Sequence, residues 1–255
     1  MQVLEFFRQL SGRNRTLRAN QQLGVILAFI AGAVNAGGFL AVHQYTSHMT
    51  GFVSIVADSF VLGDMLPFIA GIGSVISFIC GAATTGIIVN WARLRALHAT
   101  YALILILEAV LLLLFGLLGA NLHTYIAVTV PVTVVLLCFI MGLQNAVMTK
   151  MSNAGIRATH LTGVVTDLGI ELGRMLYWNH RHKRGSTHYV HARRGKLVFY
   201  ILLLTMFFVG GILGAIGFKQ IGYSTVLPLA LGLFLLGLVP LVDDAVAHFQ
   251  DFRRD

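Results

Sequence analysis

The sequence predicts an all-α, polytopic membrane protein, and three observations carry that prediction. Of its 255 residues, 57% are hydrophobic and 11% are charged, whereas an average soluble domain has about 25% charged residues. The apolar residues form runs of about 20, which as helices rising about 1.5 Å per residue cross a hydrocarbon core of about 30 Å. The basic residues lie between these runs, as the positive-inside rule expects of short cytoplasmic loops.

Six apolar runs are long enough to cross a membrane. We expect transmembrane helices near residues 22–42, 66–91, 100–119, 126–148, 197–218 and 222–242. Two shorter apolar stretches, 48–63 and 160–177, follow the first and fourth runs, and we expect short broken or re-entrant helices there. Residues 1–19 show no cleavage site of a signal peptide. They are expected to be a cytoplasmic interfacial segment, and 178–196 a basic cytoplasmic loop.

Two motifs occur twice in the same order, which predicts an internal repeat. Residues 29–36 (FIAGAVNA) recur as 139–146 (FIMGLQNA), and residues 47–53 (SHMTGFV) recur as 159–165 (THLTGVV). Apolar helices share single residues by chance, but a matched Asn followed by a matched His-x-Thr-Gly is harder to produce. The predicted membrane repeats are 20–119 and 120–255, the second of which contains the basic loop.

The orientation of the two repeats depends on the short stretches. If both cross the membrane, each repeat has four helices and the repeats are parallel. This arrangement places four basic residues outside, namely Arg93, Arg95, Lys150 and Arg157. If each dips in and returns, each repeat has three crossings and the repeats are inverted, with both termini in the cytoplasm. We favour the inverted arrangement in a bacterial inner membrane because it follows the positive-inside rule, and it is a common plan of secondary transporters.

The repeated motifs predict a binding site where two helices are broken. Glycine permits the backbone conformation of a break, Ser47 or Thr159 can cap the helix that follows, and half-helix N-termini attract anionic or strongly dipolar ligands. Asn35 and Asn145 are each expected to pair with the break that follows their helix. The alternative for these residues is simple helix packing, with hydroxyls bonded within their own helix. The predicted substrate-binding residues are Asn35, His48, Thr50, Gly51, Asn145, His160, Thr162 and Gly163.

Four acidic residues within or beside apolar runs are candidates for coupling to protons. Asp58, Glu108, Asp167 and Glu171 are these candidates, because intramembrane acids are usually functional. For Glu108 the alternative is a protonated acid that is bonded to a neighbouring helix. Arg174 shares one helix face with Asp167 and Glu171.

The motifs FIxGxxNA with SHMTG, repeated as FIMGLQNA with THLTGVVTDLG, resemble those of the YoaK-like family of uncharacterised bacterial membrane proteins. The resemblance implies a small multi-spanning membrane protein and supplies no catalytic residues.

The expected function is that of a secondary transporter or permease for a small, preferably anionic, solute. A passive channel and a non-transporting assembly or sensor protein are the alternatives. We expect no enzyme activity, no cofactor and no nucleic-acid partner, because no catalytic or nucleotide motif occurs. No metal site is expected either, since His48 and His160 lack further ligands. Membrane lipid is the expected partner, and a homo-oligomer is compatible with the sequence.

Overall fold

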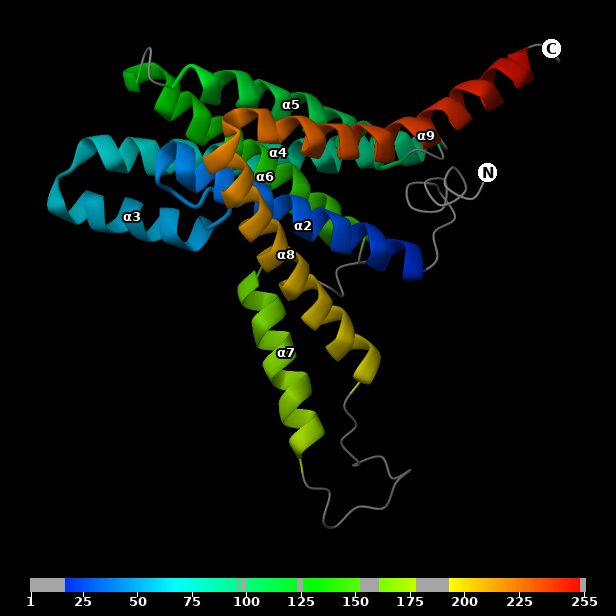
Figure 1. The fold of residues 1–255 in the computed structure, drawn as a ribbon, viewed down its shortest axis with the longest axis horizontal. Helices are drawn as coiled ribbons and strands as arrows, with labels where there is room; N and C mark the ends of the chain where they lie inside the picture. The colour runs from blue at the N-terminus through cyan, green and yellow to red at the C-terminus, as the bar shows by residue number, and fades with distance from the viewer. Residues whose placement is uncertain are drawn as a thin grey trace.

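The computed structural model describes residues 17–95, 97, 100–122, 126–151, 161–177 and 193–252, and this part of the chain is helical with short connections (Figure 1). The long helices are α2 (Leu17–Val42), α4 (Met65–Leu94), α5 (Ala102–Ala120), α6 (Ile126–Met151), α8 (Arg194–Gln220) and α9 (Val226–Phe252). The short ones are α3 (Met49–Leu62), α7 (Leu161–Leu176) and the 3-10 turn η1 (Gly222–Thr225).

The prediction of six spans and two short helices is confirmed. In the described residues, six helices are long and apolar enough to cross a membrane, and each overlaps one of the predicted runs. The predicted stretches 48–63 and 160–177 form α3 and α7. Together they make an all-α polytopic membrane protein. The predicted N-terminal segment lies mostly outside the described residues, as does most of the basic loop.

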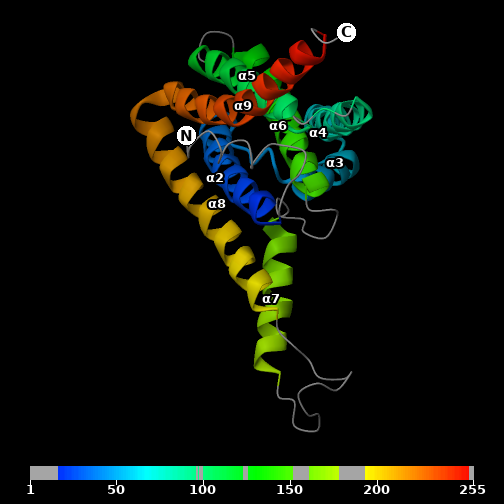
Figure 2. The same ribbon diagram turned by 90° about the vertical axis from the view of Figure 1, so that its right-hand side faces the viewer.

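The long helices run back and forth through one body. In Figure 1, α2 runs from right to left, α4 returns to the right, α5 returns to the left, and α6 leads away from the left end again. The helices α2 and α6 are therefore antiparallel. Two helical hairpins project from this body in both views: α3 lies against α4, and α7 lies against α8 (Figures 1 and 2).

A glycine makes the tight turn of the first hairpin. Gly63 ends α3 with φ 78°, and its backbone N–H bonds to the carbonyl oxygen of Ser59. This left-handed conformation is unfavourable for residues with a Cβ atom. The chain can therefore reverse at once into α4, which begins at Met65.

Two close helix crossings hold the body together, and each is made by a pair of F-x-x-G motifs. Where α2 crosses α8, a Cβ atom on Gly32 would overlap the carbonyl oxygen of Phe207, and one on Gly210 would overlap that of Phe29. The motifs involved are residues 29–32 (FIAG) and 207–210 (FFVG). Because neither glycine has a side chain, the two backbones touch directly.

The crossing of α4 and α6 has the same reciprocal geometry. A Cβ atom on Gly81 would overlap the carbonyl oxygen of Phe139, and one on Gly142 would overlap that of Phe78. The motifs are residues 78–81 (FICG) and 139–142 (FIMG). Each helix that carries the repeated FIxGxxNA sequence thus crosses the second long helix of the other half of the chain.

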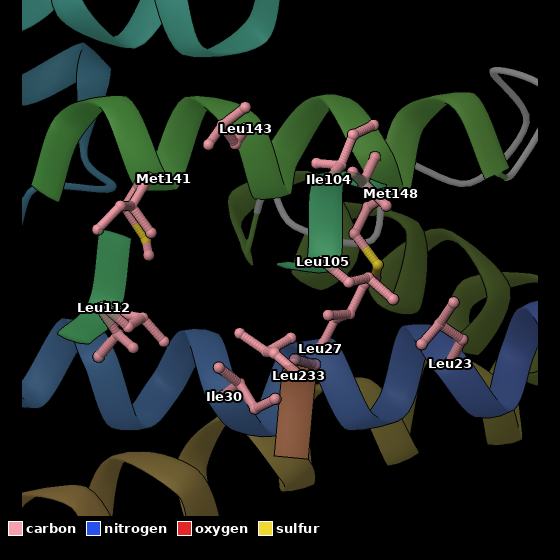
Figure 3. Packing of buried hydrophobic residues seen from close by; sticks show 14 of the residues in the cluster. Leu23, Leu27, Ile30, Ile104, Leu105, Leu112, Met141, Leu143, Met148 and Leu233 are labelled. Atoms are coloured by element: carbon pink, nitrogen blue, oxygen red, sulfur yellow. The ribbon is translucent and has the colours of Figure 1, made fainter. Parts of the chain in front are cut away.

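The main core lies among α2, α5, α6 and α9. Figure 3 shows Leu23, Leu27 and Ile30 of α2 facing α6, and Leu105 and Leu112 of α5 lie in the layer between these two helices. Large apolar side chains such as Phe60, Leu66 and Leu117 cover the outside and are exposed. An apolar exterior suits lipid, so close packing rather than exclusion from water selects the helix partners.

Candidate functional site

The first helix break separates α2 from α3 and is held by a side-chain pair. After α2 ends at Val42, His43 has φ 53° and its N–H bonds to the carbonyl oxygen of Phe39 at 2.9 Å. The Ser47 hydroxyl donates to Oδ1 of Asn35 at 2.9 Å. Asn35, within α2, therefore ties its own helix to the segment that carries the SHMTG motif.

The remaining residues of this motif begin α3. The prediction that Ser47 caps this helix is wrong: His48 occupies the N-cap position without a side-chain cap bond, because the Ser47 hydroxyl is bonded to Asn35. The imidazole of His48 lies over Gly51, where a Cβ atom would be 2.6 Å from Nδ1. His48 and Thr50 are both exposed. Gly51 thus makes room for the imidazole ring.

The second motif is placed differently. Asn145 is buried in α6, its Nδ2 donates to the carbonyl oxygen of Met141 at 2.8 Å, and its Oδ1 has no partner among the described residues. Thr162 is exposed and Gly163 half-buried in the first turn of α7. Thr159 and His160 lie outside the described residues. Among the described residues, only the first break therefore has a side-chain hydrogen bond across it, the one between Ser47 and Asn35.

An open cavity of about 440 Å³ lies at the surface between α2 and α8, where lining side chains such as Tyr45 and Phe208 are exposed. Asn35, Tyr45 and Leu161 line it together with apolar residues of α8, among them Phe207 and Ile212. Asn35 lies in α2, Tyr45 lies within the first break, and Leu161 is the first residue of α7. The cavity thus brings the first break next to the start of the second short helix. Its volume is within the range of about 300–1,000 Å³ that holds small ligands.

The four acidic candidates have very different surroundings. Asp58 is exposed on α3, and Asp167 is half-buried and hydrogen-bonded to the Tyr200 hydroxyl. Glu108 is fully buried in α5, with a relative exposure of 0% and no partner for either carboxylate oxygen among the described residues. Glu171 is also buried, with an exposure of 4%, but it is fully bonded. The four acids thus have different surroundings and do not form one group.

Glu171 connects α7 to the start of α8. The backbone N–H of Arg193 donates to its Oε2 at 2.9 Å, and Nη1 of Arg174 donates to its Oε1 at 2.8 Å. The bond from the Arg193 backbone, with the nearby charge of Arg174, lowers the pKa of Glu171 below its ordinary value. Arg174 and Glu171 thus form an ion pair within α7, and the bond from the Arg193 backbone fastens the hairpin.

The sequence interpretation missed two features of this region. Gln144 is buried in α6, and its Nε2 donates to the Leu27 carbonyl oxygen of α2 at 3.3 Å. The F-x-x-G motifs of α4 and α8 were also missed, although they are visible in the sequence as FICG and FFVG. The same pattern also occurs elsewhere in the apolar runs, as FIAG at residues 68–71 and FLLG at 234–237, so the pattern by itself does not identify the pairs that meet.

Comparison with known proteins agrees with this architecture. Residues 23–239 match the family described as "Protein of unknown function (DUF1275)". The chain is also similar to the "UPF0700 transmembrane protein YoaK" of Bacillus subtilis (strain 168), with 28% identity over 160 residues that cover 62% of this chain and 69% of the relative. No solved structure gives a significant match. The family match covers most of the chain, so this multi-pass membrane protein belongs to the DUF1275 family.

Proposed function

We propose that the protein is a secondary transporter of a small solute, with anions as the first class to test. The observation that carries the proposal is the cavity between α2 and α8, where Asn35 and Tyr45 of the first break lie near Leu161 of α7. Broken helices that border the solute site are a recurring feature of transporters. Asn35 supplies the polar group and α8 supplies an apolar wall.

We also propose that residues 20–119 and 120–255 are inverted repeats that form this site together. The two reciprocal glycine crossings support the proposal, because α2 with α8 and α6 with α4 make equivalent contacts. The antiparallel course of α2 and α6 and the two projecting hairpins support it as well (Figure 1). Movement of one repeat against the other is how such folds expose a site to alternate sides.

The inverted arrangement predicts the sidedness of two turns. Reporter fusions at Asn121, after α5, and at Gly222, after α8, should both report the periplasm of a bacterial cell. A fusion at Arg95, after α4, should report the cytoplasm, since an odd number of crossings separates it from both. A cytoplasmic signal at Asn121 contradicts the inverted arrangement.

The function is tested by a search for ligands of the purified full-length protein, followed by flux. A panel of small organic and inorganic anions, with neutral and cationic solutes as comparison, is screened for a rise in melting temperature, because a ligand of the folded state stabilises it by RT ln(1 + [L]/Kd). We expect Asn35→Leu to abolish the shift. The matched control Asn121→Leu, at an exposed residue after α5, should keep it.

Uptake of the stabilising solute into proteoliposomes then separates the alternatives. A transporter should show saturable uptake that Asn35→Leu reduces at least tenfold, since the site is occupied once per cycle. A passive channel should show uptake that rises linearly with solute concentration. Stabilisation without uptake in a functional reconstitution favours the assembly or sensor alternative.

A further inference from the structure

Glu108 is an acid in the interior of the bundle that has no ionic partner among the described residues. It has a relative exposure of 0%, and neither of its carboxylate oxygens has a hydrogen-bond partner among the described residues. Moving a carboxylate into such a place without a partner is very unfavourable, whereas a neutral carboxylic acid avoids most of that penalty. The closed packing of α5 therefore requires a proton on this side chain.

The side chain is directed into the layer between α2 and α6. Leu105 and Leu112 lie one turn before and one turn after Glu108 on the same face of α5, and Figure 3 shows both in that layer. On α6, Gln144 lies one turn from Met141 and one turn from Met148. Figure 3 draws Leu112 and Met141 at one end of the layer and Leu105 and Met148 at the other. Both faces belong to the same buried core cluster.

The layer also contains an amide that can respond to the charge of this acid. Gln144 is buried, and its Nε2 makes a long bond of 3.3 Å to the Leu27 carbonyl oxygen. An amide nitrogen has a second hydrogen to donate. Gln144 therefore places a hydrogen-bond donor in the layer toward which Glu108 is directed. Such a donor lowers the free energy of a Glu108 carboxylate when the packing opens.

The titratable groups on the helices around α5 either bond to residues other than Glu108 or lie outside the described residues. Lys150 of α6 donates to Oδ1 of Asn90 at 3.1 Å, and Arg93 of α4 donates to the Tyr101 hydroxyl at 3.2 Å. The Cys138 thiol of α6 is hydrogen-bonded to Ser74. The titratable side chains of α9, which belong to Asp243, Asp244, His248 and Asp251, lie outside the described part. No described cation therefore neutralises Glu108.

We propose that Glu108 is a proton-binding site inside the membrane-spanning bundle. Binding takes a proton from water and leaves a neutral carboxylic acid in the closed packing, and release returns the proton to water when α5 separates from α6. Glu108 is six residues after Ala102, so it lies about 9 Å along the helix from the first residue of α5. The further role of this proton, as the ion that drives solute movement, rests on the proposed transport function.

The other acidic candidates lack this combination of burial and missing partners. Glu171 is held as a carboxylate by Arg174 and the Arg193 backbone, and Asp58 is exposed. The chain has only three glutamates, Glu5, Glu108 and Glu171. Isotope labelling of glutamate therefore leaves few sources for a carboxylic-acid signal.

Infrared spectroscopy of the reconstituted full-length protein tests the proposal. With isotope-labelled glutamate at neutral pH, the wild type should show the C=O stretch of a protonated carboxyl group, shifted by the label. The Glu108→Gln variant should lose this band completely. In Glu108→Asp the label-shifted band should also be lost, because the aspartate that replaces Glu108 carries no label. This variant keeps an acid at position 108, so it serves as the test if the Glu108→Gln protein does not fold. The matched control Glu171→Gln should retain the band.

The absence of a label-shifted carboxylic-acid band in the folded wild type would overturn the proposal. So would a band that survives both Glu108 substitutions and disappears in Glu171→Gln, because the proton would then be on another glutamate. The band reports the proton alone and needs no solute. A negative result in the uptake assay therefore rejects the transport function without rejecting the proton site. Absence of the band in the wild type rejects the proton site without rejecting the transport function.

Discussion

Replacement of Gly32 by alanine is expected to destabilise the protein by about 1–3 kcal/mol, the usual cost of overpacking a filled interior. The added methyl group would overlap the carbonyl oxygen of Phe207 on α8. A backbone oxygen cannot rotate away as a side chain can, so the two helices must separate. The measurement is thermal unfolding of the purified variant in detergent. Gly142→Ala should have an equivalent effect, through the Phe78 carbonyl oxygen of α4.

The matched controls are two glycines of α4 that have open space. A Cβ atom on Gly73 or on Gly86 would meet nothing within 4 Å. Because alanine favours a helix over glycine by about 0.5–1 kcal/mol, Gly73→Ala and Gly86→Ala should leave stability unchanged or raise it. The sign of the effect thus separates the crossings from ordinary helical glycines. Equal effects at Gly32 and Gly73 would show that the crossing is not closely packed.

Glu171→Gln is expected to raise the hydrogen-exchange rate of the Arg193 amide about tenfold or more. This amide donates to Oε2 of Glu171, and a hydrogen bond to a charged group contributes about 1.5–3 kcal/mol, where about 1.4 kcal/mol corresponds to a factor of ten. Glutamine keeps the size of the side chain and removes its charge. Exchange measured by mass spectrometry over the start of α8 checks the result. Asp167→Asn, on the same helix, should leave that amide unchanged.

Acid should reproduce this effect in the wild type. The folded-state pKa of Glu171 lies below its ordinary value, which is about 4.3, so its contribution to stability is fully present above that value. The contribution is lost as the pH falls through the lowered pKa, because the unfolded chain binds the proton first. After correction for intrinsic exchange, protection of the Arg193 amide should fall in this acidic window. The Glu171→Gln variant should show no such transition.

Much of the architecture could be predicted from local sequence. The six spans follow from the length and hydropathy of the apolar runs, since a hydrocarbon core sets a minimum length for a crossing helix. The short helices α3 and α7 follow the same runs and were predicted in place. An asparagine inside an apolar run predicted a polar partner, and the structure places Ser47 opposite Asn35.

The details of the candidate site were less predictable. A serine before a helix usually caps it, and this preference failed at Ser47 because a tertiary partner, Asn35, bonds its hydroxyl first. The sequence did not distinguish the environments of the acids, but Asp58 is exposed, Glu171 is ion-paired and Glu108 is fully buried in the core. Burial of a single side chain depends on which helices surround it, and hydropathy is nearly uniform along these helices.

The sequence by itself determined the number of spans, the positions of the short helices and the family, because these depend on hydrophobic length and on motifs within one segment. Only the tertiary structure decided which helices meet. The long helices are predominantly apolar around their surface, so contact with lipid and contact with another helix are about equally favourable over most of it. The close contacts at small residues therefore select the helix partner. Those contacts are backbone against backbone at Gly32 with Phe207 and at Gly142 with Phe78.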